Sequence, residues 1–374
     1  NDGDPATKGD LCLLGRCQGF SLVRTSGSDN VGDVSFTRTA RTAGHWFVAL
    51  TQGDLSQQTH ALAFHDDPTV APFSLVQSKG ATPFTAIHSE YAVRKSGELY
   101  RFMGVDWSAN SPTANALQES GLGEAHGLWV YRDGSDVQLF LTGELDEDSY
   151  YRRCLVGAAA SCLGEPMAYP DVDTLGRGLT GTKYCDDAGA CVPVAVMAGD
   201  SIAGNGNRNN IHVHYAPDDL VWQLWYYDDL AGAYSSRDIA SYGDNRYLAV
   251  GGAGYVRYYK GYGGWSYTSG NLVSNQKDYT ISGVWIGADV VMLIAYETGK
   301  DAFADKRKVA IWTCPAALDP RDGDNWTVHD LGVIQGVTAG AFDISGTEDG
   351  QIRAVGTGTD GDLWLDGLVW YRKP

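Results

Sequence analysis

The sequence predicts an all-β protein, and three observations carry this prediction. The chain has 47 Gly, 21 Tyr and 11 Trp but only 4 Met, which favours turns and strands over helices. No stretch shows a sustained amphipathic helical pattern. The segment Ile211–Tyr227, IHVHYAPDDLVWQLWYY, has the alternation of two strands joined by a turn at Pro217-Asp218-Asp219, and weaker versions of this hairpin recur along the chain.

The hairpin recurs with a period of about 40 residues. Each unit begins near a small or polar residue and continues into an aromatic-rich second strand, as in HALAFHDD, VWQLWYYDD and VAIWTCP. The units open near the following residues: His45, His88, His126, Met167, His212, Tyr247, Trp285 and Phe342. Three or four strands at this spacing are typical of a β-propeller blade. We therefore predict a β-propeller of seven blades, with six or eight blades as alternatives and a β-sandwich plus a second all-β domain as the rival fold.

The domain prediction has two parts. Residues 1–19 are expected to form an N-terminal arm held by a disulfide, and residues 20–374 a single β-propeller domain. Strand signals in residues 20–39 predict strands that close the ring beside the C-terminal strand. Residues 144–205 interrupt the repeat with two cysteine pairs and Gly-rich segments, so we expect an irregular insertion there, of the kind that often carries function.

The charge balance limits the possible ligands. The chain has 28 Lys and Arg against 46 Asp and Glu, a net charge of −18. Such a field repels phosphates, which excludes nucleic-acid binding as the main role, and it disfavours polyanionic polysaccharides. No run approaches the roughly 18 apolar residues of a membrane helix, so no membrane span is expected. The sequence makes no prediction about the oligomeric state.

The cysteines indicate an oxidising compartment. Six of the seven form three close pairs, namely Cys12–Cys17, Cys154–Cys162 and Cys185–Cys191. We predict local disulfides in a secreted protein, extracellular or periplasmic. Structural zinc is the weaker alternative, since no pair is C-x-x-C. The chain begins at Asn1 without a Met or a signal peptide, as a processed mature form would. Cys314 is left over, either as a reactive thiol or as a buried free cysteine.

The histidines near the unit openings are the first candidates for chemistry. The first strand of each propeller blade lines the central channel, so these side chains could converge there. Imidazole titrates near neutrality, and His126 and His212 are therefore our candidate acid/base residues if the protein is an enzyme. The alternative is that the opening histidines hydrogen-bond neighbouring blades.

Two further sets of histidines are distinguished by pattern. His212 and His214 share one face of a strand and form a candidate transition-metal site, whose third ligand would come from another blade. His60, His65 and His329 are expected to be surface residues.

Two kinds of turn could also bind ligands. Acidic Gly turns at 133–136, 322–324 and 360–362 could hold a structural Ca²⁺ ion, although Asp-Gly is above all a hairpin turn signal. Tyr262 and Trp265 lie in the Gly-rich turn KGYGGWSY, and we predict that they stack on a sugar ring.

The strand segments, such as IHVHYAPDDLVWQLWYYDD, resemble the repeats of secreted bacterial β-propellers of the sialidase-like and lectin-like kind. Those proteins often carry an Asp-box turn, S-x-D-x-G-x-x-W, to which DPRDGDNW at 319–326 comes nearest. Gly323 and Trp326 are in place, but Arg321 occupies the Asp position and Asp319 the Ser position. The resemblance covers residues 42–374 as architecture and implies no catalytic residue.

We therefore predict a secreted β-propeller that recognises a carbohydrate or another extracellular ligand on one face. The first alternative is a carbohydrate-active hydrolase or lyase that uses a histidine at the channel mouth. The second alternative is a scaffold for protein interaction or surface assembly.

Overall fold

The described part of the chain is built from β-strands. The computed structural model describes residues 8–13, 16–27, 33–42, 44–53, 57–65, 74–80, 82–102, 107–108, 124–145, 148–156, 161–163, 173–185, 188–189, 191–202, 208–216, 221–228, 236–243, 246–260, 268–271, 278–298, 306–359 and 364–372. The helical segments among them are two 3₁₀ turns, η1 (Gly252–Gly254) and η2 (Gly323–Asn325). The predicted all-β class is confirmed, and no described helix is long and apolar enough to cross a membrane.

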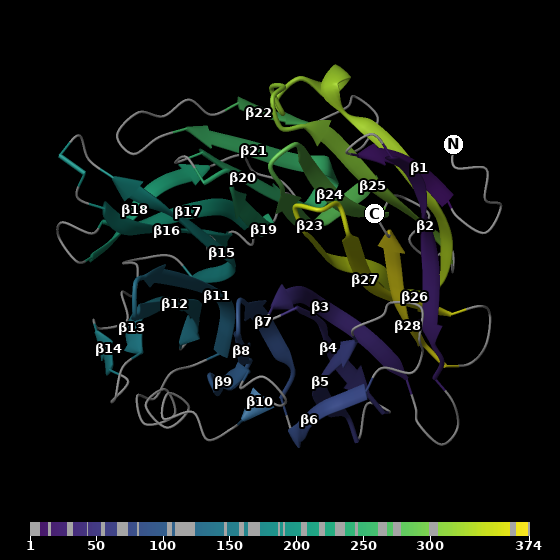
Figure 1. The fold of residues 1–374 in the computed structure, drawn as a ribbon, viewed down its shortest axis with the longest axis horizontal. Helices are drawn as coiled ribbons and strands as arrows, with labels where there is room; N and C mark the ends of the chain where they lie inside the picture. Colours follow the sequence, from purple (N-terminus) through teal and green to yellow (C-terminus); the bar gives the residue numbers. More distant parts are fainter. Residues whose placement is uncertain are drawn as a thin grey trace. The chain divides into compact units, whose positions relative to one another are not determined.

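The strands form antiparallel sheets in two compact units, Asn1–Phe84 with Gly270–Pro374 and Thr85–Ser269 (Figure 1). One sheet of the first unit consists of β3 (Val34–Thr42), β4 (His45–Gln52), β5 (Thr59–His65) and β6 (Ser74–Gly80). The other has eight strands in the order β1 (Lys8–Leu13), β2 (Arg16–Thr25), β28 (Asp366–Arg372), β27 (Ile352–Thr359), β26 (Thr327–Gly346), β25 (Lys306–Pro315), β24 (Val290–Glu297) and β23 (Tyr279–Ile286).

The second unit is made of four-stranded sheets whose strands follow one another in chain order. The first contains β7 (Phe84–His88), β8 (Tyr91–Arg94), β9 (Leu99–Phe102) and β10 (Trp107–Ser108). The next contains β11 (Glu124–Asp133), β12 (Asp136–Leu145), β13 (Asp148–Val156) and β14 (Ser161–Leu163). The last two contain β15 (Asp173–Cys185), β16 (Cys191–Ile202), β17 (Arg208–Ala216) and β18 (Val221–Asp228), then β19 (Ser236–Ser241), β20 (Arg246–Gly251), β21 (Tyr255–Lys260) and β22 (Thr268–Asn271).

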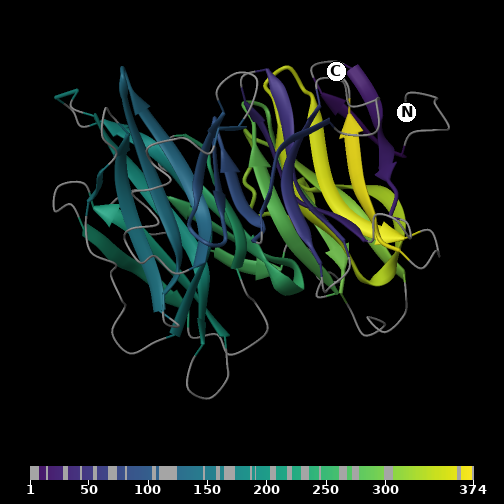
Figure 2. The same cartoon turned by 90° about the horizontal axis from the view of Figure 1, so that it is seen from below.

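The eight-stranded sheet is a four-stranded group (β23, β24, β25 and β26) and a five-stranded group (β26, β27, β28, β2 and β1) that share the long strand β26. Residues Thr327–Gln335 of β26 pair with β25, and Gln335–Gly346 pair with β27. At its other end β2 pairs with β28, with Val23 opposite Val369, so the N-terminal and C-terminal strands lie side by side (Figure 2). The expected pairing of N-terminal strands beside the C-terminal strand is therefore confirmed. The blade number and the closure of a ring stay predictions.

A β-bulge recurs in the first strand of each four-stranded sheet, and in β23 and β26 of the eight-stranded sheet, wherever the pairing with the next strand along the chain is described; we call these strands the opening strands. The opening strands with a described bulge are β3, β11, β15, β19, β23 and β26. One extra residue in the opening strand has no partner on the second strand, and the register shifts by one there. The extra residues are Thr37, His126, Arg177, Arg237, Ser282 and Phe342. A bulge re-aims the side chain that it inserts, so each of these positions presents a side chain that an unbroken strand would place elsewhere.

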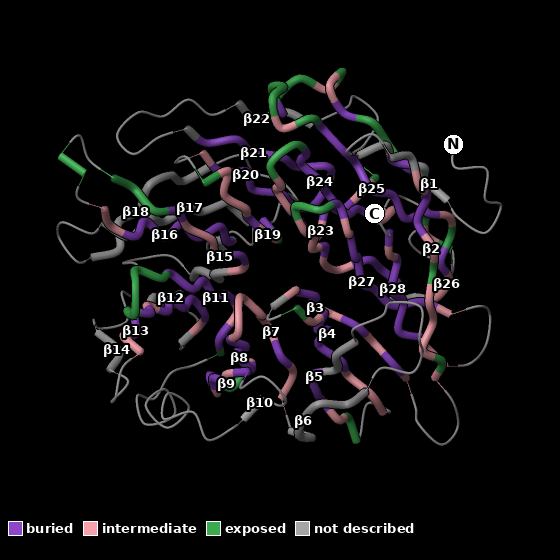
Figure 3. The backbone as a smooth tube through the Cα atoms, in the orientation of Figure 1, coloured by how far each residue is buried: buried purple, intermediate pink, exposed green. Residues whose placement is uncertain are grey.

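Neighbouring opening strands approach closely at their bulges. In the second unit a Cβ added at Gly178 would lie 2.9 Å from the Cα of Asp238. In the first unit a Cβ at Gly283 would lie 3.0 Å from the Cα of Asp343. Strands β11, β15 and β19 follow one another in this way in the second unit, as β23, β26 and β3 do in the first. The core residues lie mainly along the middle strands, and β24 is buried along most of its length (Figure 3).

Regular strands occupy two segments for which we expected other structure. Segment 144–205, expected to be an irregular insertion, holds β13, β14, β15 and β16, so that expectation was wrong. The N-terminal arm expected at residues 1–19 supplies β1 and the start of β2, and Leu11 is buried in the core beside Phe20. The hairpin Ile211–Tyr227 is confirmed as β17 and β18, which are the last two strands of their sheet rather than its opening pair.

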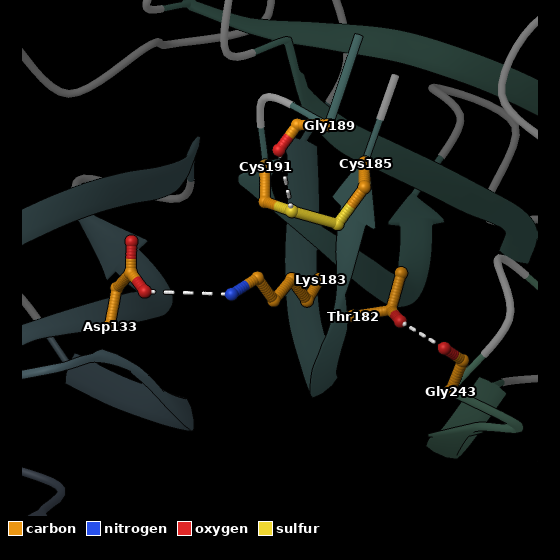
Figure 4. The surroundings of a disulfide bond; sticks show 7 residues. All are labelled: Asp133, Thr182, Lys183, Cys185, Gly189, Cys191 and Gly243. Atoms are coloured by element: carbon orange, nitrogen blue, oxygen red, sulfur yellow. Dashed lines mark hydrogen bonds and ion pairs between the residues drawn. A yellow bond between two sulfur atoms is a disulfide. The ribbon is translucent and has the colours of Figure 1, made fainter. Parts of the chain in front are cut away.

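The cysteines follow the predicted pairing wherever their side chains are described. Cys185 and Cys191 form a disulfide that ties β15 to β16 beside the Lys183–Asp133 ion pair (Figure 4). Cys154 is disulfide-bonded, and Cys162 lies opposite it in the register of β13 and β14.

The remaining cysteines differ in what the structure describes. Cys12 lies opposite Cys17 in the register of β1 and β2, but both side chains fall outside the described residues, so that disulfide stays a prediction. Cys314 is free and buried, and burial raises the pKa of its thiol to about 11, helped by Asp319 and Asp322. A thiol with so high a pKa is protonated at neutral pH, which favours the buried free cysteine over the reactive thiol.

Candidate functional site

The bulge in β11 brings three ligand-type side chains together. Glu124 lies directly opposite Glu144 of β12, and His126 is the extra residue that the bulge inserts two positions after Glu124. The ligand atoms of these three residues all lie within 4.8 Å of one another. Sequence reasoning singled out His126 but neither glutamate.

The geometry of the cluster is that of a partly open acidic site. The Nε2 atom of His126 lies 3.7 Å from a carboxylate oxygen of Glu144 and 3.9 Å from one of Glu124. The Lys95 Nζ atom lies 2.7 Å from the other oxygen of Glu124. His126 and Glu144 are half-buried, whereas Glu124 is exposed. The imidazole is therefore held among carboxylates at a position that solvent can reach.

Two arginines continue this arrangement across the second unit. The bulges of β15 and β19 insert Arg177 and Arg237, and these strands lie next to β11 in that order. We call His126, Arg177 and Arg237 the bulge row. Arg177 is half-buried and Arg237 is exposed. Three neighbouring strands thus present an imidazole and two guanidinium groups at equivalent positions.

The bulge row and its two glutamates offer both halves of a hydrogen-bonding site. Carboxylates accept hydrogen bonds from hydroxyl groups, and guanidinium groups donate in a fixed fork. The imidazole can donate or accept, depending on its protonation. Such a set suits a ligand that carries many hydroxyl groups, and the carboxylate–imidazole arrangement is also one that could move a proton.

The other predicted histidines lie in different settings. His45 lies in β4 and His212 in β17, neither of which is an opening strand, so the premise that the unit-opening histidines all lie in opening strands was wrong. His45 contacts the Phe47 ring, with centroids 6.3 Å apart. The backbones of His212 and His214 pair with Ala198 and Val196. Their side chains fall outside the described residues, so the metal site and the catalytic role of His212 stay predictions.

His88 has the structural role that we gave as the alternative for the unit openings. It ends β7, and its Nδ1 atom accepts a hydrogen bond from the backbone N–H of Val130 in β11, at 3.3 Å. Burial lowers the pKa of His88 to about 4. The neutral ring therefore joins two adjacent sheets.

This bond makes an acid-dependent loss of stability the expected result. The folded pKa of His88 is lowered, so its contribution is complete above the unfolded value of about 6.5 and falls as the pH drops towards 4. Between pH 7 and pH 4.5 we expect the free energy of unfolding of the wild type to fall by roughly 2 kcal/mol more than that of His88→Gln. Urea denaturation of both proteins at the two pH values measures this difference, with His45→Gln as the control, and equal pH dependence in the wild type and His88→Gln would refute it.

Two histidines expected at the surface are in fact buried. His60 is 6% exposed and its Nδ1 atom lies 2.8 Å from the Thr51 hydroxyl. His329 is 8% exposed and its Nε2 atom lies 2.9 Å from the Thr313 hydroxyl. The alternation of residues along these strands did not predict the burial of the two histidines. Each buried ring hydrogen-bonds a threonine hydroxyl inside the sheet. The side chain of His65 falls outside the described residues.

The remaining predicted sites divide into those used in turns and those not described. In turn 133–136 Asp133 pairs with Lys183 at 3.5 Å. Asp322 caps η2 by accepting from the N–H of Asp324. Both acidic turns thus have a structural use, and a bound Ca²⁺ stays a prediction. Tyr262, Trp265 and turn 360–362 fall outside the described residues.

Comparison with known proteins gives a fold and no family. No protein-family model matches, and no curated protein matches. Among solved structures, a protein of unknown function from Dyadobacter fermentans is 9% identical, with a TM-score of 0.51 over 94% of this chain and 98% of that one. At this identity the likeness shows a shared fold alone.

Sialidases are also among the structures that match. The Trypanosoma rangeli sialidase in complex with the inhibitor DANA is 8% identical, with a TM-score of 0.46 over 94% of this chain and 59% of that one. Its complex with sialic acid is 10% identical, with a TM-score of 0.42 over 98% and 57%. This chain thus spans less than two thirds of these sialidase chains, and TM-scores this low support no conclusion about it.

Proposed function

We propose that this protein recognises a carbohydrate in an extracellular or periplasmic setting, through the bulge row and the glutamates beside it. The observation that carries the proposal is the bulge row itself. Three adjacent opening strands share one backbone irregularity, and each uses it to present a side chain with hydrogen-bonding capacity. Glu124 and Glu144 supply acceptors at one end of the row.

The chemistry of the row favours hydroxyl groups over other ligand groups. A sugar hydroxyl donates one hydrogen bond and accepts others, so it can bridge a carboxylate and a guanidinium group. The net charge of −18 disfavours polyanionic ligands. Tyr262 and Trp265 stay our candidates for stacking on the ring of the sugar. The Cys185–Cys191 disulfide supports the oxidising compartment in which such ligands occur.

Glycan-array binding followed by titration of the best ligand tests the proposal. We expect the wild type to bind a neutral or hydroxyl-rich glycan, and His126→Ala and Arg177→Ala each to weaken binding at least tenfold, since a buried polar contact is worth about 1.4 kcal/mol or more. Arg321→Ala is the control, because Arg321 lies outside the row and pairs with Asp319. Folded protein that binds nothing on a broad array would contradict the proposal.

One observation favours a hydrolase as the second candidate. Glu124 and Glu144 place carboxylate oxygens within 4.8 Å of each other, close to the separation of about 5–5.5 Å found in retaining glycosidases. In that role His126 would tune or relay the proton. Release of reducing sugar from the glycan that binds, abolished in Glu144→Gln while binding persists, would establish this activity. Binding of the glycan without any hydrolysis would rule out the hydrolase and support carbohydrate recognition as the function.

A further inference from the structure

We propose that Glu124, His126 and Glu144 bind one divalent transition-metal ion, such as Zn²⁺ or Mn²⁺. This site differs from the metal site that the sequence predicted at His212 and His214. It also goes beyond the proposed carbohydrate recognition, because metal binding can be measured in the absence of any glycan.

The donor set and its spacing fit such an ion. Zn²⁺ accepts imidazole nitrogen at about 2.0–2.1 Å and carboxylate oxygen at about 2.0–2.2 Å, so the donors around one ion lie roughly 3–4 Å apart. Here the Nε2 atom of His126 lies 3.7 and 3.9 Å from the oxygens of Glu144 and Glu124. The oxygens of Glu124 and Glu144 lie within 4.8 Å of each other, so binding an ion would draw the exposed Glu124 side chain closer. Three protein ligands leave a position open for water or a ligand oxygen.

Sheets of the same chain show that the fold does not require these three residues. The bulge also forms in β3, β15, β23 and β26, where the cross-strand pair equivalent to Glu124–Glu144 has a different composition. Those pairs are Ser35–Thr51, Leu175–Asp200, Thr280–Tyr296 and Gly340–Thr357. Among the pairs described at this position, two carboxylates face each other only in the sheet whose bulge inserts a histidine. The bulge therefore forms without this combination of residues.

The charges of the cluster call for a cation. Like charges directly opposite each other on antiparallel strands destabilise the pair. Lys95 neutralises one oxygen of Glu124 from the turn after β8, at 2.7 Å. That leaves two carboxylates, one ammonium and an imidazole, in a protein whose net charge is already −18. A divalent ion would offset the remaining repulsion and be ligated by all three side chains.

Isothermal titration of the purified protein with Zn²⁺ alone tests this proposal. We expect binding that Glu144→Gln and His126→Ala each weaken more than tenfold. Glu348→Gln is the matched control, since Glu348 is an exposed glutamate outside the cluster, and it should bind as the wild type does. Zn²⁺ should also raise the melting temperature of the wild type and not that of Glu144→Gln, which is nearly isosteric and keeps the fold.

Affinities that are equal in the wild type, Glu144→Gln and His126→Ala would overturn the proposal, as would the absence of binding. The result is separable from the proposed function. Glycan binding that survives removal of Zn²⁺ by a chelator would show that carbohydrate recognition does not need the metal. Zn²⁺ binding by a protein that binds no glycan would support the metal site and contradict the proposed function.

Discussion

Gly178→Ala is expected to destabilise the protein by about 3 kcal/mol or more, because no neighbouring group can move aside. A Cβ at Gly178 would lie 2.9 Å from both the Cα of Asp238 and the N of Ile239, and 3.0 Å from the carbonyl carbon of Asp238. All three atoms belong to the backbone of the adjacent opening strand. Relief therefore requires β15 and β19 to separate, which disturbs the packing that holds Ile239 and Val196 in one core cluster.

Gly189→Ala is the matched control for this prediction. Gly189 has a φ of +82° and open space around its Cα, so an added methyl group costs only the conformational penalty of about 1 kcal/mol. Urea denaturation of the two variants gives the comparison. If Gly178→Ala loses no more stability than Gly189→Ala, then β15 and β19 do not approach each other as closely at Gly178 as described here.

Asp343→Ala is expected to destabilise the protein by about 2–4 kcal/mol, because it leaves two backbone donors without their acceptor. The Asp343 carboxylate accepts hydrogen bonds from the N–H groups of Thr39 and Ile344, each at 2.8 Å. Thr39 lies in β3 and Asp343 in β26, so this side chain joins the opening strands of two adjacent sheets. Arg38 lies near the carboxylate and favours its charged form.

The effect of Asp343→Ala should depend on pH. Burial raises the pKa of Asp343 to about 6, against the opposing effects of Arg38 and the two N–H groups. The folded state therefore holds a proton that the unfolded state releases above about pH 3.8, and the contribution of Asp343 to stability falls as pH rises through 6. The destabilisation should be about 1 kcal/mol larger at pH 5 than at pH 8. Denaturation curves at both pH values decide this, and equal destabilisation at pH 5 and pH 8 would show that Asp343 is charged throughout this range.

The strand content and the pairing of the chain ends could be predicted from the sequence. Alternating residues in Ile211–Tyr227 gave β17 and β18, and strand signals near residue 20 gave β2 beside β28. Spacing alone also gave the Cys185–Cys191 disulfide. The strands of 144–205 were missed because Gly-rich stretches such as TLGRGLTGT suggest loops. In the structure Gly178 and Gly181 are needed where adjacent strands and the Trp129 ring come close.

The candidate site could not be predicted, because it depends on a bulge. The turn at 133–136 pairs Asp133 with Asp136, and an unbroken register from there would set Glu124 opposite Leu145. The extra residue His126 shifts the register by one, and only then does Glu124 face Glu144. Nothing in EAHGLWVYRD marks the bulge. Comparison of all the opening strands reveals it, since the same shift recurs in each sheet where the pairing is described.

The histidines show the limit of arguing from residue type. His88, His60 and His329 have the same imidazole as His126, yet their rings hydrogen-bond Val130, Thr51 and Thr313, respectively. His126 differs in lying between two carboxylates. That difference arises from the pairing of β11 with β12, so it cannot be predicted from the position of His126 in the sequence.

Histidine-selective NMR with Mn²⁺ tests most directly whether the β11 bulge is the binding site of this protein. The ¹³C-labelled imidazole resonance of His126 can be assigned by its loss in His126→Gln. A paramagnetic ion at the cluster broadens nearby nuclei most strongly, so we expect substoichiometric Mn²⁺ to remove the His126 signal. His60 and His329 serve as the comparison, because their buried rings already bond to threonine hydroxyls and are not expected to ligate the ion. An unchanged His126 signal, or first losses at His212 and His214, would contradict the site proposed here.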